Sequence, residues 1–265
     1  MLDYKIHNEI ETQDYLVLIH GLGGNSNIFY KQLKHYKRQF NVVTIELPGH
    51  GNSPDINTYK NGFTSEIAAS EVIETLDFLK IGQAHFVGVS LGTIIIHEIL
   101  QTAPERVQST VLAGTVTRFS LFSKMLLQVG NMVKGFTPYM WIYRLFARIM
   151  MPKLNHKESR LTFVREAVKM HRKNFLGWYS LCYTIEQSYQ KVQKMAPHIP
   201  KLYISGSEDH LFIHPLKKDI KQDVSAKLCV LDHCGHICNI EKAKEFNQIS
   251  LNFLLENQNK LKQAN

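Results

Sequence analysis

The chain has 265 residues, of which 44% are hydrophobic and 20% are charged, a balance typical of a globular protein with a sizeable core. The net charge of +8 is unevenly spread along the chain. Residues 118–196 hold 14 Lys and Arg against 3 Glu and no Asp, whereas the rest of the chain holds 17 basic and 20 acidic side chains. Because the basic excess is confined to one segment, we expect no nucleic-acid partner.

The ends and the cysteines of the sequence suggest where the protein works. The amino-terminal residues lack an apolar stretch, and no uninterrupted run of 18 apolar residues occurs, so we expect neither a secretory leader nor a membrane span. The 4 cysteines are too few for a disulfide framework in a chain of this length. We therefore expect reduced thiols and a cytoplasmic location.

Short apolar runs alternate with amphipathic stretches on both sides of the basic segment. The first ten residues supply one edge strand. Further strands are predicted at residues 15–20, 41–46, 85–89, 109–113, 201–205 and 227–231. Helices are predicted at residues 27–36, 63–79, 91–101, 215–221 and 241–255. Between residues 118 and about 197 only helical periodicity is found.

This order of elements predicts an α/β fold in which helices cover both faces of a mostly parallel sheet of about seven strands. The core is formed by residues 1–117 and 197–265, and residues 118–196 form a helical cap inserted after the fourth strand of the repeating pattern.

The sequence GVSLG at residues 88–92 lies between a predicted strand and a predicted helix. In this context the pattern G-x-S-x-G is typical of a nucleophile elbow, a sharp turn that presents Ser90 at the end of the strand. The alternative is a tight turn that contains a serine without chemical function. A serine nucleophile needs a base to accept its proton, so later motifs decide between the two.

Two loops after later strands provide candidate partners for Ser90. Asp209 follows the strand 201–205 in the motif GSED, and His236 follows the strand 227–231 in the motif CGH. The order Ser, Asp, His is the one expected after an elbow of this kind, so we assign Ser90 as nucleophile, His236 as general base and Asp209 as its orienting acid. Glu208 and His233 are the neighbouring alternatives for the acid and the base.

A glycine loop, HGLGG at residues 20–24, follows the first predicted core strand. We expect the backbone N–H groups of Leu22 and Leu91 to form an oxyanion hole for a tetrahedral intermediate. With Glu46 downstream, the loop also resembles a dinucleotide-binding fingerprint. That pattern requires glycine where Ser26 stands, and it leaves the serine, aspartate and histidine unexplained, so no cofactor is expected.

The predicted cap holds both tryptophans and every methionine except Met1. Such side chains form adaptable apolar linings, and we assign Met125, Met140, Trp141 and Trp178 to the substrate pocket. The alternative is that the apolar faces of the cap helices pack on the core. The basic exterior of the cap also favours peripheral contact with an anionic membrane.

Cys234 and Cys238 lie beside His233 and His236 and raise the question of a metal site. No second pair of ligands with suitable spacing occurs elsewhere, so we expect no metal. The two thiols are expected to pack around the turn that carries His236.

Together, the motifs HGLGG, ELPGHGNS, GVSLG, GSED and CGH resemble those of small, capped esterases and lactonases of the α/β-hydrolase superfamily, over roughly residues 1–117 and 197–258. The resemblance implies an eight-stranded sheet, of which we expect the first edge strand to be absent. In similar carbon–carbon bond hydrolases and menaquinone-pathway enzymes the same triad serves other reactions, so the triad does not fix the bond that is cleaved.

From these observations we predict a serine hydrolase that cleaves an ester, thioester or lactone of a moderately hydrophobic, short-to-medium acyl group. The alternatives are a carbon–carbon bond hydrolase or a lyase with the same triad, and a non-catalytic ligand-binding receptor on the same fold.

Overall fold

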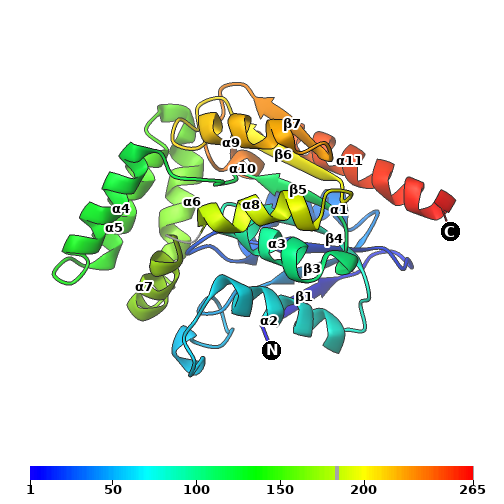
Figure 1. The fold of residues 1–265 in the computed structure, drawn as a ribbon, viewed down its shortest axis with the longest axis horizontal. Coiled ribbons are helices and arrows are strands. Elements are labelled where there is room, and N and C mark those ends of the chain that lie inside the picture. The colour runs from blue at the N-terminus through cyan, green and yellow to red at the C-terminus, as the bar shows by residue number, and fades with distance from the viewer. Residues whose placement is uncertain (183–184, 265) are drawn as a thin grey trace.

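In the computed structural model, which describes residues 1–182 and 185–264, the described strands form one seven-stranded sheet (Figure 1). The strands are β1 (Tyr4–His7), β2 (Tyr15–Ile19), β3 (Asn41–Ile45), β4 (Ala84–Val89), β5 (Val107–Ala113), β6 (Lys201–Gly206) and β7 (Ala226–Leu231). Their order across the sheet is β1-β3-β2-β4-β5-β6-β7. Only β1 runs antiparallel to its neighbour, so the predicted mostly parallel α/β fold is confirmed.

Helices cover both faces of this sheet. Outside the cap they are α1 (Tyr30–Tyr36), α2 (Ser65–Phe78), α3 (Leu91–Thr102), α8 (Ile185–Met195), α9 (Ile213–Asp219), α10 (Cys238–Glu241) and α11 (Ala243–Ala264). Short 3-10 turns are η1 (Ser26–Phe29), η2 (Ile56–Thr58), η3 (Pro104–Arg106), η4 (Leu154–His156) and η6 (Ile220–Gln222).

Alternating side chains of the strands divide the core into two layers. Val17 and Ile19 of β2 pack into the layer beneath α2, α3 and α8, whereas Leu16 and Leu18 pack into the layer beneath α1 and α11. Both sets are fully buried. The sequence of β2 is therefore a continuous apolar run, which is the pattern of a parallel strand covered on both sides.

The segment between β5 and β6 contains α4 (Leu121–Val133), α5 (Tyr139–Met150), α6 (Lys157–Ala167), α7 (Arg172–Leu181) and α8. The helices α4 to α7 stand together at one end of the molecule, on the left of Figure 1. The last helix, α8, packs along α3 instead, and its Val192 is buried in the core. The part of the segment that stands apart from the sheet therefore ends with α7, earlier than the predicted boundary at residue 196.

Within the described residues, no helix is both long enough and apolar enough to cross a membrane.

Candidate active site

The turn between β4 and α3 presents Ser90 in a strained backbone conformation. Its φ of 52° and ψ of −113° lie where a residue with a side chain is rarely found. Gly88 and Gly92, on either side of Ser90, are needed for this turn because neither position has space for a side chain. A Cβ at Gly88 would lie 2.6 Å from the Ile96 side chain, and one at Gly92 would lie 2.1 Å from the Ile19 carbonyl oxygen.

The structure brings the three predicted triad side chains together. Asp209 follows β6, His236 follows β7, and both side chains are fully buried. His236 Nδ1 lies 2.8 Å from Asp209 Oδ2, and His236 Nε2 lies 3.0 Å from Ser90 Oγ. Because a carboxylate only accepts, Nδ1 carries the proton and donates to Asp209, which leaves Nε2 to accept from the Ser90 hydroxyl. The arrangement can deprotonate Ser90 and hold the resulting imidazolium.

The glycine loop after β2 passes beside Ser90. A Cβ at Gly21 would lie 3.3 Å from Ser90 Cβ, and Leu22 and Leu91 both line the cavity above Ser90. Leu91 is the first residue of α3, so its N–H has no acceptor within the helix. Among residues 1–182 and 185–264, neither the Leu22 nor the Leu91 N–H donates to a protein acceptor. Both groups are thus available to a ligand, as an oxyanion hole requires.

Two buried histidines hold the glycine loop in place. The Gly23 N–H donates to His50 Nε2 at 3.0 Å, and His50 Nδ1 donates to the Pro48 carbonyl at 3.1 Å. Burial, together with the neighbouring His20, lowers the pKa of His50 to about 3, so the ring is neutral and can accept. His20 Nδ1 likewise donates to the Gly21 carbonyl at 2.8 Å. The two histidines therefore fix the loop through Gly21 and Gly23 and leave the Leu22 N–H free for a ligand.

Glu46, which the dinucleotide alternative would place against a ribose, braces the same loop. Its Oε1 accepts a hydrogen bond of 3.0 Å from the Ser26 N–H, and its carboxylate lies 3.3 Å from His20 Nε2. One oxygen of the carboxylate is thus bound within the protein to the loop itself, in agreement with the preference for the hydrolase interpretation.

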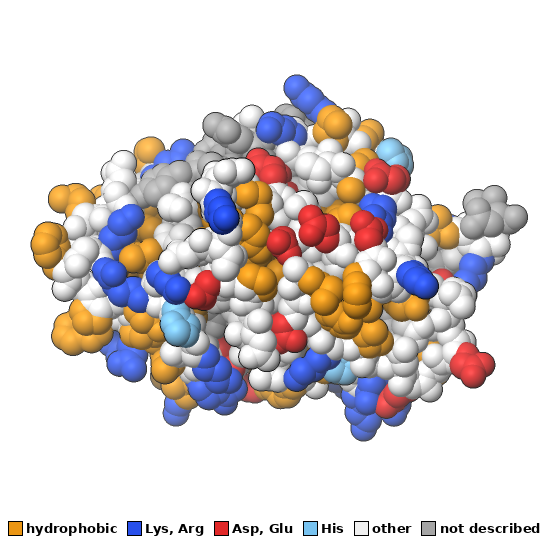
Figure 2. Space-filling model, turned by 90° about the horizontal axis from the view of Figure 1, so that it is seen from below, with side chains coloured by type: hydrophobic (Ala, Val, Ile, Leu, Met, Phe, Trp, Pro, Cys, Tyr) orange, Lys and Arg blue, Asp and Glu red, His pale blue; other side chains and the backbone are white. Residues whose placement is uncertain are grey.

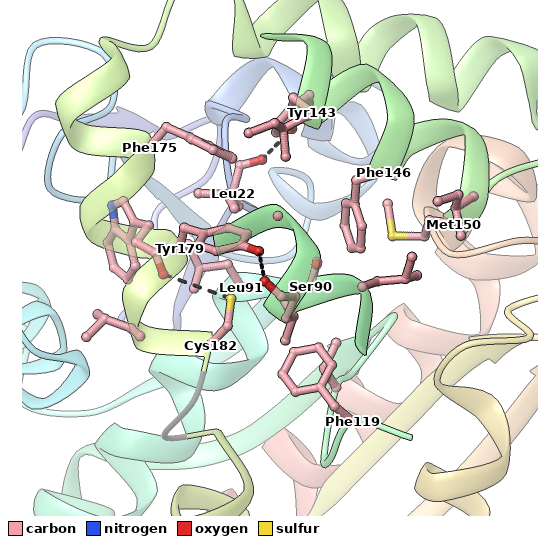
Figure 3. Close-up of a pocket in the computed structure, with 18 of the residues that line it drawn as sticks. Leu22, Ser90, Leu91, Phe119, Tyr143, Phe146, Met150, Phe175, Tyr179 and Cys182 are labelled. Atoms are coloured by element: carbon pink, nitrogen blue, oxygen red, sulfur yellow. Dashed lines mark hydrogen bonds between the residues drawn. The ribbon is translucent and has the colours of Figure 1, made fainter. Parts of the chain in front are cut away.

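Above Ser90 lies an apolar cavity of about 180 Å³. Its walls come from the elbow and from α4, α5 and α7, with Phe119, Phe146 and Tyr179 arranged around Ser90 (Figure 3). No Lys, Arg, Asp or Glu is among the described residues that line it. The cavity therefore suits an uncharged, hydrophobic group next to the nucleophile.

Of the four residues predicted to line the pocket, only Trp178 does so. Trp141 is 68% exposed and Met125 is 51% exposed, while Met140 packs against the core. The prediction for these three residues was wrong because it considered composition without helix phase. Trp141 lies three residues before Arg144 and seven before Arg148, which places it on the charged outer face of α5.

Apart from Leu145, which is 60% exposed and lies four residues after Trp141, the residues of α5 that line the cavity have the complementary phase. The α5 residues of the lining are Ile142, Tyr143, Leu145, Phe146, Ile149 and Met150, a stripe with helical spacing that the sequence could have revealed. Tyr143 also has a second role, because its hydroxyl donates to the Leu22 carbonyl at 2.7 Å, as drawn in Figure 3. The cap thereby touches the proposed oxyanion loop directly.

Glu208, the alternative acid, faces away from the triad and contacts η4 of the cap. Its carboxylate lies 2.8 Å from Lys153 Nζ and 2.9 Å from both Asn155 Nδ2 and His156 Nε2. Hydrogen bonds from Asn155 and Lys153 lower the pKa of Glu208 to about 2. His233, the alternative base, is 86% exposed and lies 3.5 Å from the same carboxylate. Neither residue contacts Ser90.

A second carboxylate completes this contact between cap and core. Glu241 accepts from the Ser159 hydroxyl and from the Gly235 N–H, both at 2.6 Å, and it lies 3.8 Å from His156 Nε2. The buried His156 therefore sits between Glu208, next to Asp209, and Glu241, which holds the residue before His236. We call His156, Glu208 and Glu241 the cap clamp.

The thiols considered as metal ligands are both buried around the turn that carries His236. Within the described residues, no group of three or more His, Cys, Asp or Glu side chains is placed to hold a metal ion.

Comparison with known proteins agrees with this geometry. A family model described as the alpha/beta hydrolase fold matches residues 14–145. The chain is 28% identical to a 2-hydroxy-6-oxononadienedioate/2-hydroxy-6-oxononatrienedioate hydrolase of Burkholderia vietnamiensis, over 95% of this chain and 91% of that one. It is 37% identical to the pimeloyl-(acyl-carrier protein) methyl ester esterase of Methylococcus capsulatus, over 38% of this chain and 37% of that one.

A solved structure from a study of carboxylesterases of Nitrososphaera gargenis superposes with a TM-score of 0.79 at 23% identity, covering 98% of this chain and 96% of that one. The sheet order, the elbow turn and the matches over nearly the whole length agree with one another. The chain belongs to the α/β-hydrolase superfamily, and the two relatives named above are hydrolases.

Proposed function

We propose that the protein is a serine hydrolase that cleaves a carboxylic ester, thioester or lactone of a moderately hydrophobic, short-to-medium acyl group. The observation that carries this proposal is the hydrogen-bonded chain from Ser90 Oγ through His236 to Asp209 at the base of an apolar cavity. Such a chain activates a serine that is otherwise a weak nucleophile.

In the proposed reaction, Ser90 Oγ attacks the acyl carbonyl carbon while its proton passes to His236 Nε2. The oxyanion accepts hydrogen bonds from the Leu22 and Leu91 N–H groups. When the intermediate collapses, the bond to the leaving alcohol breaks and His236 donates the proton to that oxygen. A water then gives its proton to His236 and attacks the acyl-enzyme, which releases the acid and returns the proton to Ser90.

The cavity supports an uncharged acyl group as the substrate. No Lys, Arg, Asp or Glu is among the described residues of its lining, and burying an unpaired carboxylate there would be costly. No cofactor enters the proposed reaction, and a cytoplasmic location stays a prediction.

A second candidate is a carbon–carbon bond hydrolase, which the 28% identity to the Burkholderia vietnamiensis enzyme favours. The name of that enzyme describes a dioate, a substrate with two carboxylates. Because no Lys or Arg of the described residues lines the cavity here, we rank this candidate second.

Hydrolysis of p-nitrophenyl esters from acetate to decanoate tests the proposal. Each methylene that enters the cavity contributes about 0.8 kcal/mol, so kcat/KM is expected to rise about fourfold per methylene until the cavity is full. Ser90→Ala is the inactive control. Turnover of carboxylated substrates alone, with no hydrolysis of neutral esters by the folded enzyme, would support the second candidate instead.

A further inference from the structure

The outer faces of α4 and α5, with the loop that joins them, carry an unusual concentration of exposed apolar side chains. We call this surface the cap face. Its members are between 38% and 94% exposed: Leu121, Phe122, Met125, Val129, Met132, Val133, Phe136, Trp141 and Leu145. Figure 2 shows hydrophobic and basic side chains at the end of the molecule formed by these helices, on the left, with acidic side chains nearer the middle. Patches of this kind mark interaction surfaces.

The segment that forms the cap face is basic. Residues 118–157 include seven Lys and Arg and no Asp or Glu. Of these seven, Arg118 pairs with Asp219 and Lys153 pairs with Glu208. Arg144 and Arg148 stand one turn apart on the exposed side of α5, and neither pairs with a carboxylate among the residues that the structure describes. An apolar surface bordered by cations matches the interface of an anionic bilayer, where apolar side chains enter the acyl region and cations contact the headgroups.

The cavity reaches the surface within the cap face. Val129 and Val133 of α4 and Leu145 of α5 line the cavity, and each is also exposed to solvent. A molecule entering between these residues passes from the cap face to Ser90 along apolar side chains.

We propose that the cap face binds the surface of an anionic phospholipid bilayer and that an acyl substrate dissolved in the bilayer enters the cavity between α4 and α5. The part about substrate entry rests on the proposed hydrolase function, whereas the binding does not. A second copy of the chain is a poorer occupant, because two identical cap faces would bring cations against cations without any acidic partner.

Trp141 provides the direct test of binding. It is 68% exposed on the cap face, and the only other tryptophan, Trp178, is 1% exposed inside the protein. We expect Trp141 fluorescence to shift to the blue on vesicles of phosphatidylcholine with phosphatidylglycerol, and not on phosphatidylcholine alone. High salt should reverse the shift by screening the charges. The Ser90→Ala variant should bind equally well, since binding needs no catalysis.

Matched variants distinguish binding through the cap face from binding through the overall charge or hydrophobicity of the protein. Each basic residue near an anionic surface strengthens binding roughly fivefold, so Arg144→Gln with Arg148→Gln should weaken it about 25-fold. The control, Lys244→Gln with Lys260→Gln on α11, removes the same charge from exposed positions outside the cap face. Phe136→Ser should also weaken binding, whereas Val224→Ser, at a residue that is 96% exposed before β7, should not.

The proposal is overturned if Trp141 shows no shift on anionic vesicles at low salt, or if the α11 control weakens binding as much as the arginine pair. A concentration-dependent dimer that buries Trp141 in solution would also overturn it. Hydrolysis of a water-soluble butyrate ester should be unchanged in all cap-face variants. If vesicle binding occurs but no ester is hydrolysed, the hydrolase proposal fails and the binding proposal stands.

Discussion

Asp209 and Glu208 are adjacent carboxylates that have different contacts and different roles. Asp209 is buried and accepts from His236 Nδ1, whereas Glu208 contacts η4 of the cap. The peptide geometry of the loop after β6 separates the two, and the motif GSED alone does not show which one turns inward. The contacts assign the acid to Asp209.

We predict that Asp209→Asn lowers kcat by about 10⁴-fold, because an amide at this position would favour the wrong tautomer of His236. Glu208→Gln, a change of the same kind one residue away, should retain kcat within tenfold at neutral pH. Steady-state hydrolysis of one p-nitrophenyl ester by both variants checks this. Equal losses in the two variants would contradict the assignment of the acid.

At the scale of elements, strands and motifs could be predicted because their signals are local. The buried run at β2 and the serine between Gly88 and Gly92 need only neighbouring residues to be recognised. The orientation of α4 and α5 could not be predicted from composition, since it depends on which face the core covers. Composition alone therefore predicts Trp141 in the pocket, although its spacing from Arg144 puts it on the outer face, where it is 68% exposed.

The cap clamp of His156, Glu208 and Glu241 could not be predicted from the sequence either, because its three members lie far apart in the chain. His156 is fully buried between Glu208 and Glu241. We predict that His156→Leu removes the hydrogen bond to Glu208 and lowers the free energy of unfolding by about 1–3 kcal/mol. Urea denaturation measures this value.

The matched control for the clamp is Leu154→Ala in the same turn, η4, where the side chain is 88% exposed. This change should alter the free energy of unfolding by less than about 0.5 kcal/mol. If His156→Leu is as stable as this control, the clamp does not hold the cap.

At the scale of the whole molecule, buried neutral histidines should make the fold sensitive to acid. Burial lowers the pKa of His50 and His97 to about 3, and that of His85 to about 4. Below pH 6.5 the unfolded chain binds protons that these folded residues do not. The stability from their neutral state is therefore complete above pH 6.5 and is lost as the pH falls towards 3.

We predict that the free energy of unfolding decreases between pH 7 and pH 5, and that His97→Gln makes this decrease shallower. Each histidine contributes up to about 1.4 kcal/mol per pH unit, and the Gln amide can still hydrogen-bond to Tyr203, which His97 contacts at 3.1 Å. Urea denaturation at pH 7, 6 and 5 measures the slopes. Parallel slopes for the two proteins would show that His97 does not titrate as described.

The measurement that tests the central claim most directly is covalent labelling of the folded protein with a fluorophosphonate, followed by mass spectrometry of its peptides. An activated serine should form a single phosphonyl adduct on Ser90, and labelling should be absent in Ser90→Ala and greatly slowed in Asp209→Asn. A folded protein that is not labelled, or that is labelled equally after Ser90→Ala, would contradict the account and favour a binding protein on this fold.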